Sequence, residues 1–411
     1  MMLRRASISL LWAGLLSLGV LSMVRADVSP DAPGQVATLP DAVGDHWVWV
    51  PDRALRRSVL FDGDSGDMLG LIDSGMSITP KAPQWSKKRG EIYSVDTIYT
   101  RGHHGERQDF VFIYDARTLD VKGEISIPPR SADTSTGVSL LGMLDGERFL
   151  VVLNHAPGSS VSVVDLEARA FVEEIQTAGC AGVYPAGDAR FGMLCGDGTA
   201  ITVTLNGAGA LERIGRSDPF FDVIEDPVSE KGARDGARWL YTSFEGLLHT
   251  VDYAGDAPVV LPSWSLFDDD QRRRGWRAGG GQYLAYHPPS KRLYVIVHEG
   301  GPGSHKDPGS EVWVYDTVAQ QRVATFSMPN ELVAFIRPQI GFEAGGFTEW
   351  LLSKVLPNLG VHSVAVTQDD APLLFVRHAD LGAVGVLDAQ TGAHLRDLDE
   401  VGLSGILLVV P

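Results

Sequence analysis

The chain has 411 residues, of which 44% are hydrophobic, and a formal net charge of −17 at pH 7. This acidic excess argues against a nucleic-acid partner, because an acidic surface cannot neutralise phosphates. The sequence also has no G-x-S-x-G, H-E-x-x-H, C-x-x-C or phosphate-loop motif, so it gives no support to the hydrolase, zinc-protease, thiol-redox or nucleotide-binding classes that these motifs indicate.

Residues 1–26 have the features of a secretory signal peptide. Arg4 and Arg5 precede an apolar run from Ile8 to Met23, and the small residue Ala26 follows at a cleavage position. Removing this leader, with its three arginines and no acidic residue, changes the net charge from −17 to −20. A retained signal anchor is the alternative, since the run is only marginally long enough to span a bilayer. We expect an exported, periplasmic chain with no membrane span after leader cleavage.

Residues 27–44 are rich in Pro, Asp and Ala and are predicted to form an extended N-terminal arm. The rest of the chain, residues 45–411, is predicted to be one all-β domain. Its first alternating strand is HWVWVPD, His46 to Asp52. In a closed ring of sheets, such an N-terminal strand is expected to complete the last sheet and so remove its free edge.

A hairpin motif recurs along residues 45–411. Each copy is a run of β-branched and aromatic residues that ends at a turn residue. The turn positions are Asp62, Asp115, Asp165, Asn206, Asp252, Asp316 and Asp388. Because one hairpin cannot bury both of its faces, the copies must stack on one another. The pattern predicts an all-β, seven-bladed β-propeller of four-stranded antiparallel blades.

Residues 329–360 interrupt this pattern. Thr348 to Leu356 is predicted to be a short helix, with Thr348 as N-cap and Pro357 beyond its end. Its apolar stripe consists of Trp350, Leu351 and Val355. An apolar helix inserted between blades either caps the propeller or docks on a partner, and we favour docking.

Cys180 and Cys195 flank a predicted strand–turn–strand segment. In an oxidising compartment such a pair favours a disulfide that closes a short loop, a crosslink worth about 3 kcal/mol in the chain-entropy model. A metal pair is disfavoured, because no His or further Cys lies at ligand spacing.

The segment Asp62 to Asp73 has carboxylates at several positions of a calcium-binding loop. However, Gly66 and Asp67 occupy the positions where a ligand and then a glycine are needed. The segment also coincides with one of the repeated turns, so we interpret it as a hairpin turn.

Two polar loops could carry chemistry. One holds the potential metal ligands His298, Glu299, His305 and Asp307, and the other holds Arg101, Glu106, Arg107 and Asp109. The irregular spacing in the first favours a hydrogen-bonded loop between strands. The second is interpreted as an ion-pair network that pins a long connection, with catalysis as the alternative. The residues therefore predict no catalytic residue and no metal site in this chain.

Two motifs go beyond what propellers share, R-G-x-x-G-E-R-x-D at Arg101 to Asp109 and G-W-R-x-G-G…A-Y-H at Gly275 to His287. Further segments of the same kind are Val161–Phe171, the Cys180/Cys195 pair with Tyr184 and Pro185, Val364–Val376 and Asp388–Leu398. In these segments the chain resembles the heavy chain of the periplasmic methylamine and aromatic amine dehydrogenases. The loop His298 to Lys306 looks closer to the aromatic amine branch.

The resemblance implies a non-catalytic propeller subunit in a heterotetramer of two heavy and two light chains. The small, disulfide-rich light chain would hold the cofactor tryptophan tryptophylquinone and the catalytic Asp, take a primary amine as substrate, and pass electrons to a small blue copper protein. This chain would carry no cofactor and would be inactive alone. One alternative is a stand-alone exported β-propeller that serves as a protein-binding module, and another is a propeller enzyme with its own quinone or metal.

The resemblance also assigns one substrate-channel residue. Methylamine dehydrogenases have a Phe after an I-D-G-G turn of the heavy chain, facing the channel, and Met76 stands in that place in LIDSGMSITP. A flexible thioether in place of a rigid ring would change the channel width and hence the amine preference. The alternative is that Met76 packs between blades. The insertion at residues 329–360 departs from the family pattern and leaves the partner geometry open.

Overall fold

The computed structural model describes residues 38–40, 43–73, 75, 81–132, 137–328, 330, 332–333, 336, 340–341, 346–378, 383–398, 401–402, 404–405 and 407–411. The predicted leader, most of the predicted arm and Met76 lie outside the described residues. None of the helices in the described part combines the length and the apolar character that a membrane span requires.

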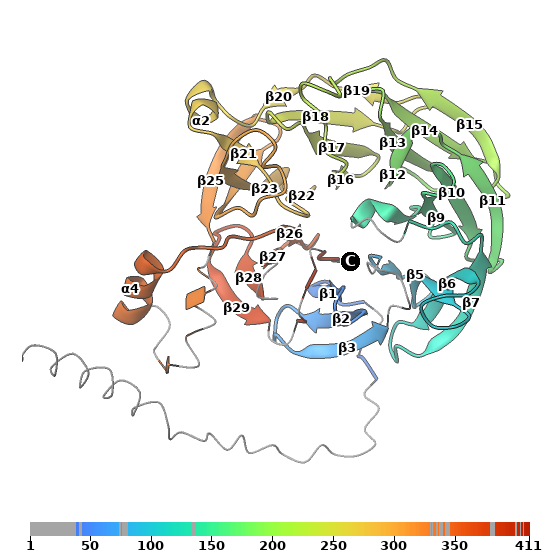
Figure 1. The fold of residues 1–411 in the computed structure, drawn as a ribbon, viewed down its shortest axis with the longest axis horizontal. Helices are drawn as coiled ribbons and strands as arrows, with labels where there is room; N and C mark the ends of the chain where they lie inside the picture. Colours follow the sequence, from blue (N-terminus) through green and yellow to red (C-terminus); the bar gives the residue numbers. More distant parts are fainter. Residues whose placement is uncertain are drawn as a thin grey trace, which may run out of the picture. The chain divides into compact units, whose positions relative to one another are not determined.

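Seven antiparallel sheets follow one another along the chain and form a ring (Figure 1). Blade 1 consists of β1 (Trp47–Asp52), β2 (Arg57–Asp62) and β3 (Met68–Asp73). Blade 2 consists of β4 (Gln84–Ser86), β5 (Glu91–Tyr99), β6 (Arg107–Asp115) and β7 (Val121–Ile127). Blade 3 consists of β8 (Leu141–Met143), β9 (Phe149–Asn154), β10 (Ser160–Asp165) and β11 (Ala170–Gln176). Blade 4 consists of β12 (Cys180–Pro185), β13 (Arg190–Cys195), β14 (Ala200–Leu205) and β15 (Leu211–Arg216). Blade 5 consists of β16 (Ala233–Asp235), β17 (Arg238–Thr242), β18 (Leu247–Asp252), β19 (Val259–Val260) and β20 (Trp264–Ser265).

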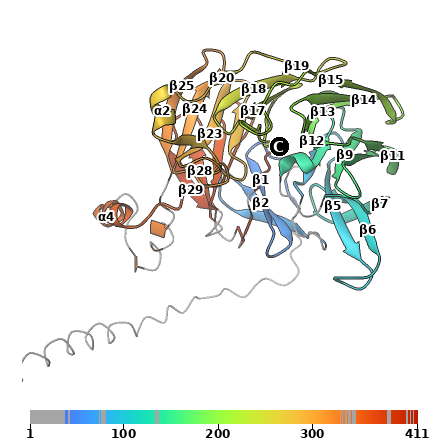
Figure 2. The same ribbon diagram turned by 45° about the horizontal axis from the view of Figure 1, so that its top comes forward.

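Blade 6 consists of β21 (Trp276–Ala278), β22 (Leu284–His287), β23 (Arg292–Glu299), β24 (Glu311–Asp316) and β25 (Gln321–Ser327). Blade 7 consists of β26 (Ser363–Val366), β27 (Leu373–Arg377), β28 (Val384–Asp388) and β29 (His394–Leu398). The described helices are the 3-10 helix η1 (Val138–Leu140), α2 (Asp269–Arg273) and α4 (Phe347–Val355). Within a blade the strands run outward in chain order, for example from the inner β26 to the outer β29 (Figures 1 and 2). The predicted seven-bladed β-propeller is confirmed.

The predicted turn residues close the outer hairpin of the blades. In blade 2, Asp115 Oδ1 accepts hydrogen bonds from the backbone N–H groups of Arg117 (2.9 Å) and Thr118 (3.1 Å). Four residues after the Asp, Leu119 has the left-handed backbone angle φ 60, and Gly66 and Gly392 occupy the same place in blades 1 and 7 with φ 86 and φ 74. This Asx-turn geometry explains why a short polar residue recurs at these positions.

Blade 1 is completed by the C-terminal segment. The N–H of Trp49 donates to the carbonyl of Val409 at 2.8 Å, and the N–H of Val409 donates back to Trp49 at 3.0 Å. The expectation that the strand His46 to Asp52 completes the last blade is therefore wrong. Among the residues that the structure describes, blade 1 has three strands of its own, and the end of the chain covers the inner edge that β1 would otherwise leave unpaired.

The helix α4 begins one residue earlier than predicted. Its N-cap is Gly346, which makes no side-chain capping bond, and Leu356 is its C-cap. The prediction of Thr348 as N-cap is therefore wrong. Because the helix already starts at Phe347, Thr348 lies within its first turn.

Candidate functional site

The two faces of the ring carry different loops. In antiparallel blades, the connections between blades lie at the same end as the loops between the second and third strands. We call this end the connection face. The opposite end, which carries the hairpins with the turn Asp residues, is the turn face. The two predicted polar loops, the disulfide and the inserted helix α4 all belong to the connection face by their place between strands.

A cavity of about 620 Å³ lies inside the ring. Its described lining comes mainly from the innermost strands and the end of the chain, and includes Gln84, Trp85, Trp239, Leu284, Ala365 and Pro411. The chain ends at the centre of the ring in Figure 1, which agrees with the place of Pro411 in this lining. Gln282 holds this segment, because its Nε2 donates to Leu408 O at 2.9 Å and its Oε1 accepts from Leu408 N at 3.1 Å.

The loop between β5 and β6 is anchored by a buried ion pair. Asp109, which is fully buried, accepts from Nε and Nη2 of Arg107, both at 2.9 Å. It also accepts from the Thr97 hydroxyl at 2.9 Å and from the Ser131 N–H at 2.8 Å. Burial alone would raise the pKa of Asp109, but its contacts with Arg107 and Ser131 outweigh burial and hold this pKa below its usual range.

The predicted network in this loop is thus formed by Arg107 and Asp109, which face one another because residues two apart on a strand share a face. Arg101 and Glu106 are not part of this ion pair, so the prediction that they belong to the network is wrong. Their backbone N–H groups donate within the loop, Arg101 N–H to His104 O at 3.0 Å and Glu106 N–H to the Thr100 hydroxyl at 3.1 Å. The ion pair binds the connection after blade 2, at Ser131, to the sheet. This geometry supports the structural interpretation of the loop rather than a catalytic one.

Three of the four potential metal ligands at this loop, His298, Glu299 and His305, contact different partners. His298 Nε2 is 2.9 Å from the Ser304 hydroxyl, and Glu299 forms an ion pair with Arg274 at 3.0 Å. The ring of His305 stacks on Phe244, with 3.8 Å between ring centres. Burial lowers the pKa of both His298 and His305. Their arrangement is that of a packed polar loop.

Lys231 lies beside this loop and has no signal in the sequence. Its Nζ donates to Gly280 O at 2.8 Å and lies 5.6 Å from the ring centre of Tyr283. Burial lowers the pKa of this amine. The hydroxyl of Tyr283 bonds in turn to Thr242 at 2.7 Å. The sequence shows only a lysine in a loop that contains Ser and Gly. The burial of Lys231 could not be predicted from it, because this burial depends on a contact with Gly280, which lies 49 residues later.

The segment Asp62 to Asp73 forms a repeat turn, as interpreted. Asp62 Oδ1 accepts from the N–H of Asp64 at 2.8 Å. Both carboxylate oxygens of Asp64 lie 2.8 Å from Nδ1 of His46. The Asp62 carboxylate therefore stabilises the hairpin, and the Asp64 carboxylate binds His46, a residue for which the sequence predicts no such contact.

Cys180 and Cys195 are joined by a disulfide, as predicted, with an S–S distance of 1.98 Å. They are opposite one another in the register of β12 and β13, and both side chains are buried. The crosslink therefore ties the first two strands of blade 4.

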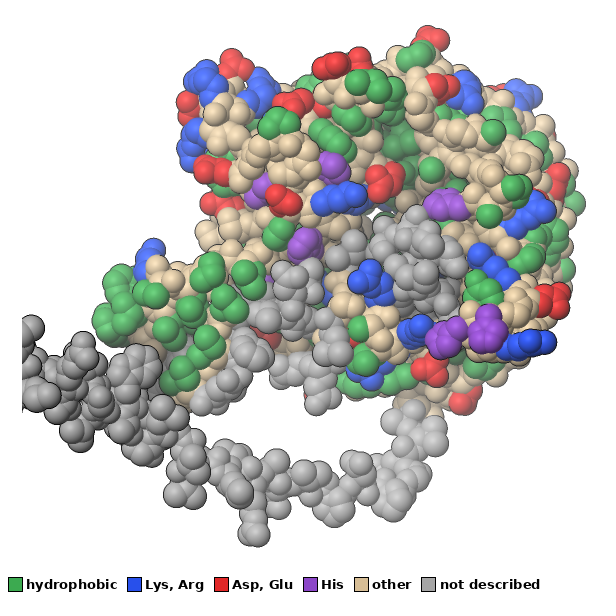
Figure 3. All heavy atoms as spheres, viewed as in Figure 1, with side chains coloured by type: hydrophobic (Ala, Val, Ile, Leu, Met, Phe, Trp, Pro, Cys, Tyr) green, Lys and Arg blue, Asp and Glu red, His purple; other side chains and the backbone are tan. Residues whose placement is uncertain are grey.

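The inserted helix α4 exposes its apolar side chains. Phe347 is 75% exposed, Trp350 55% and Val355 72%. Figure 3 shows hydrophobic side chains gathered at the surface where α4 lies in Figure 1. A cap on the propeller would bury such side chains against the blades, so the observed exposure favours the docking interpretation.

Comparisons with known proteins bear on the whole ring. The sequence matches the family profile described as methylamine dehydrogenase heavy chain (MADH) over residues 48–339. The methylamine dehydrogenase heavy chain of Methylorubrum extorquens is 23% identical over 352 residues, covering 85% of this chain and 78% of that protein. That of Paracoccus versutus is 24% identical over 375 residues, covering 89% and 79%. The solved structure of dihydro-heme d1 dehydrogenase NirN in complex with DHE aligns with a TM-score of 0.53 at 15% identity, over 91% of this chain and 76% of that chain, which shows a shared fold alone.

Proposed function

Because this chain belongs to the methylamine dehydrogenase heavy chain family, we propose that it is the non-catalytic heavy subunit of a primary-amine dehydrogenase complex. The observation that carries the proposal is the family match over residues 48–339, which extends from β1 through β25 and so covers six of the seven blades. The complex would be an oxidoreductase that acts on the CH–NH2 group of primary amines.

In this proposal the redox group, tryptophan tryptophylquinone, resides in a light chain and would take up the electrons of the amine. A small blue copper protein would receive them in turn. The contribution of this chain would be a rigid connection face that docks the light chain and walls the substrate channel. The buried Arg107–Asp109 pair supports this role, because it fixes a long loop of that face at Ser131. The hydrogen bond from Lys231 Nζ to Gly280 O fixes a second loop of the connection face.

Met76 is proposed as the channel residue, by its place in the sequence between β3 and β4. Export to the periplasm is proposed as well, because residues 1–26 carry the pattern of a signal peptide.

Purification of the tagged full-length chain from the periplasm of its native host tests the proposal. We expect a small chain with a quinone absorption band to co-purify, and we expect the complex to reduce an artificial electron acceptor when a primary amine is added. The chain produced alone should neither absorb in the visible range nor oxidise amines. Amine oxidation by the isolated polypeptide would contradict the proposal, as would a native preparation without a light chain.

A second candidate function is that of a stand-alone propeller that binds another protein. The exposed apolar side chains of α4, among them Trp350 and Val355, favour it. A Trp350→Ser, Val355→Ser variant separates the two functions when its native pull-down is compared with that of the unmodified chain. Loss of a partner other than a quinone-bearing chain would favour the second function, whereas retention of the quinone-bearing chain and of amine oxidation would favour the first.

A further inference from the structure

The ring closes where blade 7 meets blade 1. Side chains of both blades form one apolar cluster, which includes Val50 and Phe61 from blade 1 and Phe375 and Val386 from blade 7. The chain runs from blade 7 into the C-terminal segment that completes blade 1, but this segment is bound to β1 only by noncovalent contacts, so closure of the ring depends on such contacts. The charged groups at the two ends of the seam between blades 7 and 1 therefore matter to ring closure.

At the connection face the seam is held by Arg377. This side chain is fully buried, and its Nη1 donates to Pro51 O at 2.8 Å and to Leu407 O at 2.9 Å. Burial lowers the pKa of Arg377 to about 10. This end of the seam thus keeps its cation at neutral pH.

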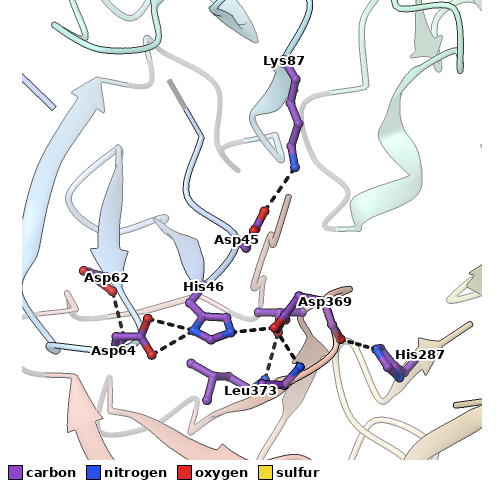
Figure 4. Close-up of polar contacts among 10 residues, drawn as sticks. Asp45, His46, Asp62, Asp64, Lys87, His287, Asp369 and Leu373 are labelled. Atoms are coloured by element: carbon purple, nitrogen blue, oxygen red, sulfur yellow. Dashed lines mark hydrogen bonds and ion pairs between the residues drawn. The ribbon is translucent and has the colours of Figure 1, made fainter. Parts of the chain in front are cut away.

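At the turn face the seam is held by His46, which lies between two carboxylates (Figure 4). Nδ1 of His46 is 2.8 Å from both carboxylate oxygens of Asp64, in the outer hairpin of blade 1. Nε2 of His46 is 3.1 Å from Oδ2 of Asp369, between β26 and β27 of blade 7. His46 therefore joins the first and last blades at this face through two carboxylates, and the hydrogen bond from Arg396 of blade 7 to Gly63 O of blade 1 also crosses the seam there.

The geometry defines the charge state of this histidine. An ionised carboxylate only accepts hydrogen bonds, and both ring nitrogens donate only in the imidazolium form. Asp369 is held ionised, because its Oδ1 accepts from the Thr367 hydroxyl at 2.7 Å and its Oδ2 accepts from the Ala371 N–H at 3.0 Å. A neutral imidazole would place a lone pair against one of the two carboxylates.

The other charged groups nearby already have partners. Asp45, next to His46 in the chain, forms an ion pair with Lys87 of blade 2 at 3.6 Å. From blade 6, His287 Nε2 contacts the backbone oxygen of Asp369 at 2.9 Å, and its Nδ1 contacts Ser290. From the outer strand of blade 7, Arg396 donates to Gly63 O at 2.6 Å. The proton on His46 is thus the charge that compensates the two facing aspartates.

We propose that the first and last blades are joined by a proton-dependent latch, in which the His46 imidazolium holds Asp64 and Asp369 together and ring closure weakens when the ring loses its proton. Burial lowers the pKa of His46, but the hydrogen bonds to Asp64 and Asp369 outweigh burial and raise this pKa above its ordinary value of 6.5. A raised folded-state pKa means that the stabilisation is fully present below the unfolded-state value and is lost as pH rises through the folded-state value.

Thermal unfolding of the purified full-length protein between about pH 5.5 and about pH 8.5 tests the latch, since this range brackets the titration of histidine. We expect the Tm of the unmodified protein to fall by on the order of 2 °C as pH rises through the His46 titration. His46→Gln should have the lower Tm at acidic pH and should lack this fall. His394→Gln is the matched control, because His394 pairs at 2.8 Å with Asp397 of its own strand β29, so that this histidine–carboxylate pair lies within one blade.

Two further measurements keep the test independent of whether His46→Gln folds. The imidazole of His46, followed by NMR in the unmodified protein, should titrate above the ordinary value of about 6.5. Hydrogen exchange at Trp49 and Val409, whose N–H groups pair across the inner edge of blade 1, should speed up as His46 deprotonates. A His46 titration at or below the ordinary value overturns the latch, and so does an unchanged pH dependence of Tm in His46→Gln.

Discussion

The substitution Asp109→Asn removes the charge at the centre of the anchored loop in blade 2 and keeps its shape. The carboxylate is fully buried and accepts four hydrogen bonds, two from Arg107, one from Thr97 and one from Ser131. The amide can accept with only one of its two terminal atoms. The change therefore leaves the partly buried guanidinium of Arg107 without its counter-charge and sets the amide N–H groups of the new side chain against N–H donors.

The expected loss in the free energy of unfolding is about 3 kcal/mol, the lower end of the range for breaking a buried ion pair. The lower end applies because the Arg107 side chain is 23% exposed, so that water can partly rehydrate it. Because the folded-state pKa of Asp109 is depressed, its stabilisation is present above the unfolded-state pKa and is lost as pH falls through the folded-state pKa. The difference in the free energy of unfolding between Asp109→Asn and the unmodified protein should therefore be largest at neutral pH.

Urea denaturation at neutral pH and again at acidic pH measures both effects. The matched control is Asp270→Asn, which breaks the surface pair of Asp270 with Arg273, where both side chains are about 70% exposed, and should cost less than about 0.5 kcal/mol. A second comparison is the double variant Arg107→Met, Asp109→Leu, which should lose less than the two single changes together. A neutral-pH loss for Asp109→Asn no larger than that of the control would refute the reasoning.

Three other changes test the disulfide, the ring closure and the channel residue. Cys180→Ser with Cys195→Ser should lower the free energy of unfolding by about 3 kcal/mol, and a denaturation midpoint equal to that of the unmodified protein would contradict this. Deletion of residues 407–411 should leave the inner edge of β1 unpaired and promote self-association, which light scattering detects, whereas a monodisperse truncated protein would contradict the assigned role of Val409. Met76→Phe should shift the amine chain-length preference, measured as kcat/KM over a series of primary amines on the reconstituted complex, and identical ratios would remove Met76 from the channel wall.

The sequence alone determined the blades of this protein. Alternating apolar residues that end at an Asp are a local signal, because the strand period and the Asx-turn both act within a few residues. The Asp115 turn and the left-handed Leu119 that follows it show this local control. For the same reason, the facing of Arg107 and Asp109 could be predicted, since they lie two residues apart on one strand.

The tertiary structure decided which distant groups meet. His46 and Asp369 are 323 residues apart in the chain, yet their side chains bond across the seam of the ring. The pairing of Trp49 with Val409, and the burial of Lys231 against Gly280, are also contacts between distant segments. No local pattern specifies such contacts, because they arise only when the blades stack on one another and the ring closes.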